Sequence, residues 1–259
     1  MLNLSNRYVL YINLWTHFLL FVTMSCLVGC GASYVTPGGA AQISSLTESD
    51  IQKALDRKPA SSFPARLAVV RVQASGYRSY RCESYGRGHY SVVTTRDIET
   101  DEHFDRLAKL PMITAVGRIN RILIPSELIS DKELRIAAAN VHADLLFAYT
   151  FDTAFRVKDH DIGPMGVITL GFLPNHEAKV TSTASAAVLD VRTGFVYGLA
   201  EATAREKEWT TVWTSTDTVD DLRRRAETKA FAELLDEFDI TWKGIVEEHA
   251  AKPIKTPVK

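Results

Sequence analysis

The chain has 259 residues, with 30 Lys and Arg against 31 Asp and Glu, and its formal net charge is −1 at pH 7. Its hydrophobic fraction of 46% and charged fraction of 24% are typical of a globular protein. This balance provides no basic field that would attract nucleic acid, so it argues against a nucleic-acid partner.

The first 30 residues have the composition of an export signal. Arg7 is the only charged residue among them, and Leu, Phe, Val and Ile dominate residues 8–28. A positive start, an apolar run and a small-residue cleavage site define a secretory signal. An uncleaved membrane anchor is the alternative, but polar residues interrupt the run and no basic cluster follows it.

The end of this run, Leu27-Val28-Gly29-Cys30, resembles the lipobox of bacterial lipoproteins position by position. The resemblance implies cleavage before Cys30, a diacylglyceryl group on its sulfur and a palmitate-type chain on its new amino group. Residues 1–29 are therefore the predicted signal peptide, and Cys30 is the predicted lipid-attachment residue. Two or three acyl chains are needed because one holds a protein only weakly. Gly31 implies the periplasmic face of the outer membrane in a Gram-negative cell.

The cysteines predict a fold without an intramolecular disulfide. Cys26 leaves with the signal and Cys30 carries lipid, so Cys82 has no cysteine partner within the mature chain. The pattern favours a packed, unreactive thiol at Cys82 over a redox or interchain site.

Residues 30–60 are predicted to form the lipidated start, a flexible tether and a short helix. Pro37 and Gly38-Gly39 indicate flexibility, and Thr47 is expected to cap a helix that carries Ile51 and Leu55 on one face. We expect a globular domain over residues 61–249 and a disordered tail over residues 250–259.

The first half of the domain contains three predicted strands and one predicted helix. Ala65–Val72 is expected to be a core strand, Tyr90–Thr95 a second strand, and Arg118–Pro125 a third that ends at its proline. Phe104, Leu107 and Ala108 indicate a short helix between the second and third strands.

Gly76–Tyr90 is the most unusual segment, because Tyr and Arg residues alternate with Gly and Ser in it. Tyr and Arg commonly provide the energetic hot spots of interfaces. The candidate partner-binding residues are Tyr77, Arg78, Tyr80, Arg81, Tyr85 and Arg87. The alternative, which the pattern favours, is a long hairpin loop whose Tyr rings pack on the domain.

The second half alternates helix and strand. Ser130 and Glu133 form a capping box, which opens a helix with Leu134 and Ala138 on its apolar face. Asp144–Phe151 is apolar at nearly every position, so the strand–helix–strand order predicts parallel pairing beneath a helix.

The last third predicts a hairpin and a long helix. Ala178–Arg192 and Phe195–Arg205 are expected to be its strands, with the turn at Thr193-Gly194. Thr218 is expected to cap a helix whose apolar residues recur every four positions, at Leu222, Ala226, Ala230, Leu234 and Phe238. The predicted fold class is mixed α/β: one domain, with a mixed sheet packed by helices, a β-hairpin and a long C-terminal amphipathic helix.

This order of elements resembles the N-terminal domain of TolB and the periplasmic domain of CsgG-type lipoproteins. The resemblance rests on Leu67–Val72, Ala137–Tyr149 and Leu189–Tyr197, the last of which contains an Asp-x-x-Thr-Gly turn. It implies a non-enzymatic role in envelope assembly, secretion or stress response. The apolar patch Val167–Leu173 is shorter than a membrane-spanning strand, which argues against a pore.

Motifs for catalysis, metal binding and cofactor binding are missing from the sequence, so we expect no enzyme activity, metal or cofactor. Gly-x-Ser-x-Gly, His-Glu-x-x-His and Cys-x-x-Cys are all absent. Lys158–Asp161 places a His between two carboxylates, which fits a cation site or a base, but a solvated turn is favoured. His142 lies near a helix end, where it suits the helix dipole.

The leading hypothesis is an envelope lipoprotein that is anchored through Cys30 and acts by protein contacts, with a protein partner or as a homo-oligomer. One alternative is a lipid- or glycan-binding module that uses the Val167–Phe172 patch. The other is a hydrolase whose site residues are scattered along the sequence.

Overall fold

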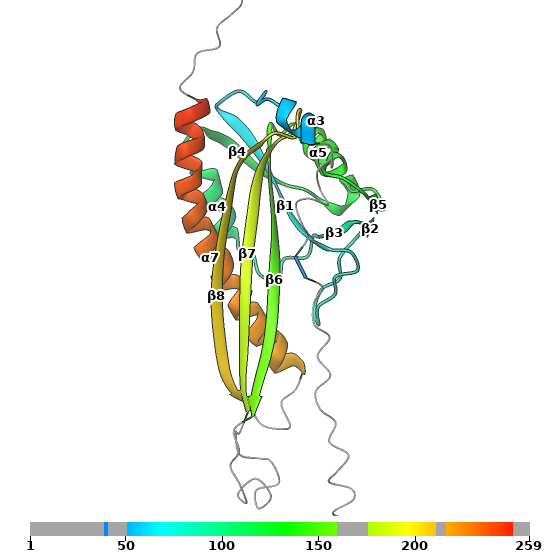
Figure 1. Ribbon diagram of the computed structural model, residues 1–259, viewed down its shortest axis with the longest axis vertical. Helices are drawn as coiled ribbons and strands as arrows, with labels where there is room; N and C mark the ends of the chain where they lie inside the picture. Colours follow the sequence, from blue (N-terminus) through cyan, green and yellow to red (C-terminus); the bar gives the residue numbers. More distant parts are fainter. Residues whose placement is uncertain (1–38, 41–50, 160–175, 211–215, 251–259) are drawn as a thin grey trace, which may run out of the picture.

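The computed structural model describes residues 39–40, 51–159, 176–210 and 216–250. They form a single mixed α/β domain around a six-stranded sheet of order β3-β1-β6-β7-β8, with β4 also paired to β1 (Figure 1). The fold class predicted from sequence is confirmed. The strands of this sheet are β1 Ala65–Ala74, β3 Tyr90–Val93, β4 Ile113–Arg118, β6 Leu145–Asp159, β7 His176–Asp190 and β8 Val196–Thr210.

Helices and a small second sheet complete the described domain. The helices are α3 Ile51–Asp56, α4 Asp101–Ala108, α5 Asp131–Asn140 and α7 Thr216–His249. The short strands β2 Arg87–Gly88 and β5 Glu127–Leu128 pair in parallel apart from the main sheet. Among the described residues, none of the helices combines the length and the hydropathy that crossing a bilayer requires.

Asp144–Phe151 does lie in a parallel strand pair, but its parallel neighbour is β1 and not a strand over Arg118–Pro125. β1 runs parallel to β6, with Leu67 opposite Leu145 and Arg71 opposite Tyr149. The other edge of β1 is divided between two neighbours, since its first half pairs in parallel with β4 and its second half pairs antiparallel with β3. α5 links β5 to β6 and begins with the predicted capping box at Ser130.

Two cores lie on opposite faces of the sheet, as the strand period of two requires. Phe147, Tyr149 and Phe151 of β6 pack with α7 on one face. Leu146 and Ala148 pack with α5 on the other. The repeat predicted for the long helix is confirmed, and Trp242, Phe231 and Phe238 are its fully buried aromatic side chains.

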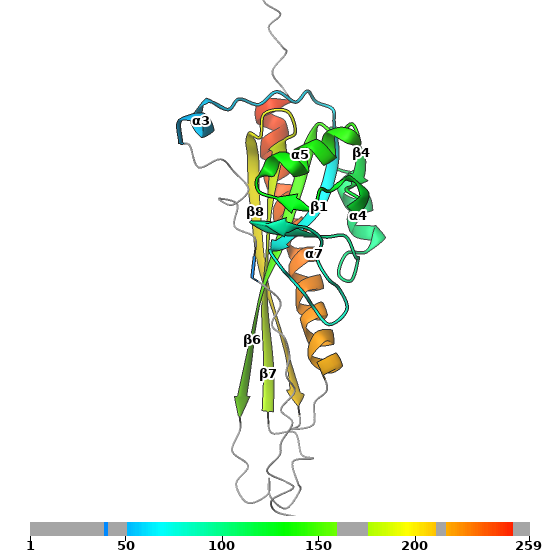
Figure 2. The same ribbon diagram turned by 90° about the vertical axis from the view of Figure 1, so that its right-hand side faces the viewer.

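The three long strands set the shape of the domain. β6, β7 and β8 each have 15 residues and pair along their whole length. At about 3.3 Å per residue, each spans roughly 50 Å. Their lower halves extend well below α5 and β1, with α7 along one side (Figure 2). The face opposite α7 is therefore left uncovered by the described helices in this lower half.

The predicted hairpin and its turn are confirmed. Asp190 is fully buried at the end of β7, and its Oδ1 accepts hydrogen bonds from the backbone N–H groups of Arg192 and Thr193 at 2.8 and 3.0 Å. Its Oδ2 accepts from the N–H groups of Ala60 and Ser61, both at 2.7 Å. One carboxylate thus closes the turn and fixes the start of the domain to it.

The strand predicted over Arg118–Pro125 is wrong. The strand β4 ends at Arg118, and Arg121–Leu123 forms a 3₁₀ turn instead. The side chain of Asn120 accepts a hydrogen bond from the N–H of Ile122 at 3.1 Å, which stabilises the turn locally. Ile122 is 88% exposed, so the apolar run there does not mark a buried strand.

Two helix starts also differ from the prediction. α7 begins at Thr216, two residues before the expected cap Thr218. α3 is described from Ile51, and the expected cap Thr47 lies outside the described residues. Ile51 and Leu55 do share one side of α3, but they are 76% and 74% exposed. Their spacing therefore does not mark a core-facing helix.

Candidate functional site

A cluster of charged side chains lies buried between the sheet and α7. Arg71 of β1 and Arg223 of α7 are its cations, and both are almost completely buried. Arg71 Nη1 lies 2.9 Å from Asp97, and Arg223 Nη2 lies 2.8 Å from the other oxygen of the same carboxylate. The remaining carboxylates of the cluster belong to Glu99, Asp220 and Glu227.

The pKa values of two carboxylates in the cluster, Glu227 and Asp97, shift in opposite directions. Burial raises the pKa of Glu227, and Arg71 and Arg223 offset only part of that effect. Burial also opposes ionisation of Asp97, but the same two guanidiniums bring its pKa below the usual value. Glu227 is therefore the more easily protonated of these two carboxylates.

This cluster holds elements together. Thr153 of β6 donates a hydrogen bond to Glu227 Oε1 at 2.8 Å, and Tyr149 donates to Glu99 at 2.7 Å. Arg71 also lies over the ring of Phe151, 4.7 Å from its centroid. The cluster therefore joins β1, β6 and α7 through charged and hydrogen-bonded contacts.

Half of the predicted partner loop packs against the domain. Tyr77 is 2% exposed, and its hydroxyl accepts a hydrogen bond from Arg71 at 3.1 Å. Arg81 reaches the first turns of α7, where it lies 2.8 Å from Asp217 and 3.1 Å from Asp221. Cys82 is a buried free thiol beside these groups, as the packed-thiol interpretation predicts.

The other predicted loop residues lie in different surroundings. Tyr85 lies beneath the guanidinium of Arg121, at 4.2 Å from its ring centroid, and Arg87 belongs to β2. Tyr80 is 59% exposed, and Arg78 is exposed and paired with Glu83 at 3.2 Å. The loop therefore does not gather its Tyr and Arg side chains on one face.

A groove on the open face of the sheet is the best candidate site among the described residues. Its volume is about 490 Å³, which is within the range of ligand and peptide pockets. The floor is apolar and is formed by Val72, Ala148, Ala187 and Leu199. Leu199 is 61% exposed, which is unusual for a large apolar side chain in a sheet.

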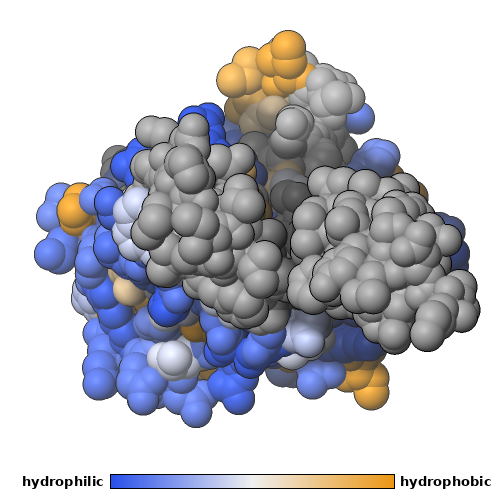
Figure 3. Space-filling model, turned by 90° about the horizontal axis from the view of Figure 1, so that it is seen from below, coloured by the Kyte–Doolittle hydropathy of each residue, from blue (hydrophilic) through white to orange (hydrophobic). Residues whose placement is uncertain are grey.

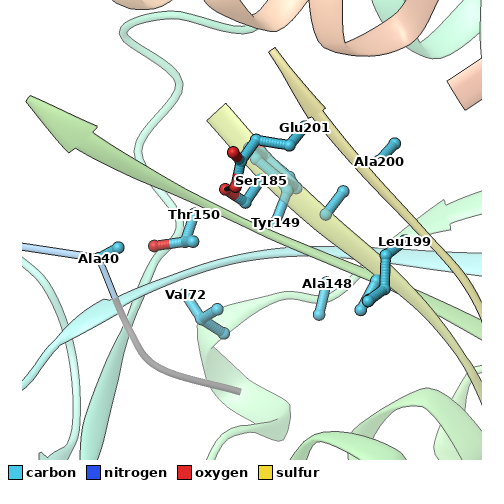
Figure 4. Close-up of a pocket in the computed structure, with 11 residues that line it drawn as sticks. Ala40, Val72, Ala148, Tyr149, Thr150, Ser185, Leu199, Ala200 and Glu201 are labelled. Atoms are coloured by element: carbon cyan, nitrogen blue, oxygen red, sulfur yellow. Dashed lines mark hydrogen bonds between the residues drawn. The ribbon is translucent and has the colours of Figure 1, made fainter. Parts of the chain in front are cut away.

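The rim of the groove is polar and acidic. Ser185 of β7 donates a hydrogen bond to Glu201 of β8 at 2.8 Å, and Thr150 of β6 completes the row (Figure 4). Ala40 lies beside Thr150 and also lines the groove. It is held there because Ala74 of β1 donates its N–H to the carbonyl of Gly39 at 3.3 Å. The groove thus combines an apolar base with one carboxylate at its edge.

Other predicted candidates contribute nothing to this groove. Cys30 and the patch Val167–Leu173 lie outside the described residues, as do the side chains of Lys158–Asp161. His142 follows α5 in the left-handed backbone region, with φ of 55°. The described residues contain no group of three or more His, Cys, Asp or Glu side chains placed to hold a metal ion.

Sequence reasoning missed both the groove and the buried cluster. Ala148, Ser185 and Leu199 are ordinary strand residues, and only the pairing of β6, β7 and β8 brings them together. Arg71 within an apolar strand was the available signal for the cluster, since a buried charge requires a partner.

Comparison with known proteins gives similarities of arrangement only. The sequence matches no protein-family model and no curated protein. A DUF330 protein from Xanthomonas campestris is 15% identical, with a TM-score of 0.35 over 82% of this chain and 99% of that one. The lipoprotein GNA1162 from Neisseria meningitidis is 11% identical, with a TM-score of 0.28 over 66% and 99%.

A third similar structure is a PelC dodecamer from Paraburkholderia phytofirmans, 12% identical, with a TM-score of 0.26 over 69% of this chain and 91% of that one. All three TM-scores are below 0.5, so these likenesses carry no conclusion about the role of this chain.

Proposed function

We propose that this chain is a lipid-anchored envelope protein that acts by holding an extended segment of a partner protein, without catalysing a reaction. The lipobox ending at Cys30 supports the anchor. The single observation that carries the proposed contact is the apolar groove on the open sheet face, beside the outer edge of β8.

The edge of β8 offers backbone groups next to the groove. No described strand pairs with this edge. Thr241 of α7 donates a hydrogen bond to the carbonyl of Leu199 at 3.2 Å, so this carbonyl points away from β7 and is already occupied by α7. Because successive residues of a strand alternate in direction, the backbone groups of Glu201 and Thr203 point outward as well. An added strand gains its affinity from such groups.

The side chains at the rim of the groove indicate which kind of partner segment would bind there. An extended peptide on this edge places alternate side chains toward the groove, where an apolar one meets Leu199 and Ala187. Glu201 and the exposed Asp152 give the surroundings a negative charge. The partner segment is therefore apolar with a neighbouring Lys or Arg.

Site-specific photocrosslinking in intact cells tests the contact. A photoreactive residue replaces Thr203 at the open edge, and the matched control replaces Ile122, which is exposed on the 3₁₀ turn. We expect a discrete protein adduct from position 203 alone. Its crosslinked peptide should contain an apolar residue beside Lys or Arg, and Glu201→Lys should reduce the yield several-fold.

Equal yields at both positions would contradict the proposed contact. Adducts to lipid alone from position 203 would also overturn it, in favour of a lipid-binding module. The anchor is tested separately by labelling with palmitate. We expect label on the native chain, and we expect Cys30→Ala to remain unlabelled and to lose its native fractionation.

A further inference from the structure

At the lower end of β8, the acidic and the basic side chains lie on opposite faces of the strand. Arg205, Glu206, Lys207 and Glu208 alternate along the strand. The pleat turns the two acids toward α7, where Glu206 lies 3.6 Å from Lys229 and Glu208 pairs with Arg225. Arg205 and Lys207 are therefore on the open face, and both are exposed.

Cations from the neighbouring strands join them. Arg156 of β6 is directly opposite Lys179 of β7, which is directly opposite Lys207 of β8. All three are exposed, and Arg205 is on the same face, two residues before Lys207 along β8. Three adjacent strands thus present one row of like charges. We call Arg156, Lys179, Arg205 and Lys207 the basic row.

Arg156 and Lys179 are like charges directly opposite each other in an antiparallel pair, which destabilises the pair because their side chains begin about 5 Å apart. A bound anionic surface offsets this repulsion. The acids higher on the same face, Asp152 and Glu201, are in other rows of the register. The geometry therefore favours an anionic ligand at the lower end.

The next row toward the end of the strands favours a membrane over other polyanions. By register it contains Lys158, Glu177 and Trp209. The side chain of Trp209 is described and is 58% exposed. Trp beside Lys and Arg is the composition of protein surfaces at the headgroup level. In the view from below, the described residues that are visible are mostly hydrophilic (Figure 3).

The length of the tether permits this contact. Gly39 lies beside Asp152, since a Cβ at Gly39 would be 4.0 Å from Asp152 Oδ1. The end of β6 at Asp159 is seven residues farther, roughly 23 Å along the strand. Nine residues separate Gly39 from Cys30 and span up to about 30 Å. A lipid on Cys30 can therefore enter the membrane that the strand ends touch.

We infer that the basic row docks the domain on anionic phospholipid headgroups and so fixes its orientation on the membrane. This inference rests on the proposed lipid anchor. The groove is three rows from Lys179 on the same sheet face, so docking through the basic row also fixes the position of the groove relative to the bilayer.

Residue-resolved amine labelling of the acylated chain tests the inference. The chain is reconstituted into vesicles of phosphatidylcholine or of equimolar phosphatidylcholine and phosphatidylglycerol, and labelling is measured by mass spectrometry. Lys132 on α5 is exposed and serves as the internal control. We expect labelling of Lys179 and Lys207, relative to Lys132, to fall several-fold on the anionic vesicles and to recover at high salt.

Charge reversal provides the matched variants. The double variant Arg156→Glu, Lys179→Glu should lose the protection of Lys207 on anionic vesicles, whereas Lys132→Glu should keep it. Equal labelling ratios on both kinds of vesicle would overturn the docking. Protection of Lys207 that persists in the double variant would overturn it as well.

The same preparation separates this inference from the proposed anchor. An acylated chain floats with phosphatidylcholine vesicles whether or not the basic row binds. Flotation without protection of Lys179 therefore refutes only the docking. Loss of flotation on phosphatidylcholine, with capture by anionic vesicles and protection of Lys179, refutes the anchor and supports the docking.

Discussion

At the scale of single residues, the Asp190 carboxylate joins two separate parts of the chain through six hydrogen bonds. Besides its four backbone donors, Oδ2 accepts from the hydroxyls of Ser61 at 2.9 Å and Tyr197 at 3.1 Å. Burial raises the pKa of this carboxyl, but the donors, led by the N–H groups of Ala60 and Thr193, bring it below the usual value. Burial, together with the contact to Asp190, raises the pKa of Tyr197 to about 12.

We predict that Asp190→Asn destabilises the domain by about 2–3 kcal/mol, because an amide leaves buried N–H donors without an acceptor. Asp236→Asn on the exposed side of α7 should change stability by less than about 0.5 kcal/mol. Urea unfolding of both variants measures the difference.

The effect of Asp190 has a defined pH dependence. A carboxyl whose pKa is lowered by folding stabilises the protein above its unfolded pKa of about 3.9, and this stabilisation is lost as the pH falls through the folded value. The difference in the free energy of unfolding between the native chain and Asp190→Asn should therefore be largest at neutral pH and should shrink as the pH falls. A difference that grows as the pH falls would contradict this assignment.

Arg223 is the second residue with a predictable effect. It neutralises Asp97, Asp220 and Glu227, which are all buried. We predict that Arg223→Met costs about 3–5 kcal/mol, since it leaves uncompensated charge in the interior. Arg78→Met should be nearly neutral because its single ion pair is exposed. Thermal unfolding compares the two, and equal losses would show that the cluster is not a stabilising unit.

At the scale of elements, the lower part of the sheet contains like charges on neighbouring strands, which destabilise it locally. Lys179 lies between Arg156 and Lys207 in one row. We predict that Lys179→Glu stabilises the fold by about 0.2–1 kcal/mol, because the repulsive cross-strand pair with Arg156 becomes attractive. The measurement is the urea midpoint at low salt, with Lys132→Glu as the control. A destabilised Lys179→Glu variant would mean that the row is not strained by its own charges.

At the scale of the whole molecule, one sheet is shared by two cores. Trp242 is buried on the α7 side and Leu134 on the α5 side. Because β1 and β6 contribute to both, neither side can be lost alone. We predict that Leu134→Ala lowers stability by about 2–5 kcal/mol and that tryptophan fluorescence and far-ultraviolet circular dichroism shift together. Separate transitions for the two probes would show that the α5 side unfolds independently.

The sequence by itself determined the elements whose signals are local. The capping box of Ser130 gives α5, the four-residue repeat of Leu222 and its successors gives α7, and Thr193-Gly194 gives the hairpin turn. These patterns act through neighbours in the chain, so they are readable without the fold. The same local reasoning failed at Asn120, where a side-chain hydrogen bond replaced the expected strand with a turn.

Only the tertiary structure decided what the molecule presents to its surroundings. Tyr77 and Arg81 are both predicted to belong to a binding loop, but Tyr77 is buried against Arg71 and Arg81 pairs with the start of α7. Residues 205–208 contain two bases and two acids, and the partners of β8 place the acids on one side and the bases on the other. The reason is physical: the sign and burial of a side chain depend on which strand or helix lies opposite it. That neighbour is distant in sequence and is fixed only when the sheet forms.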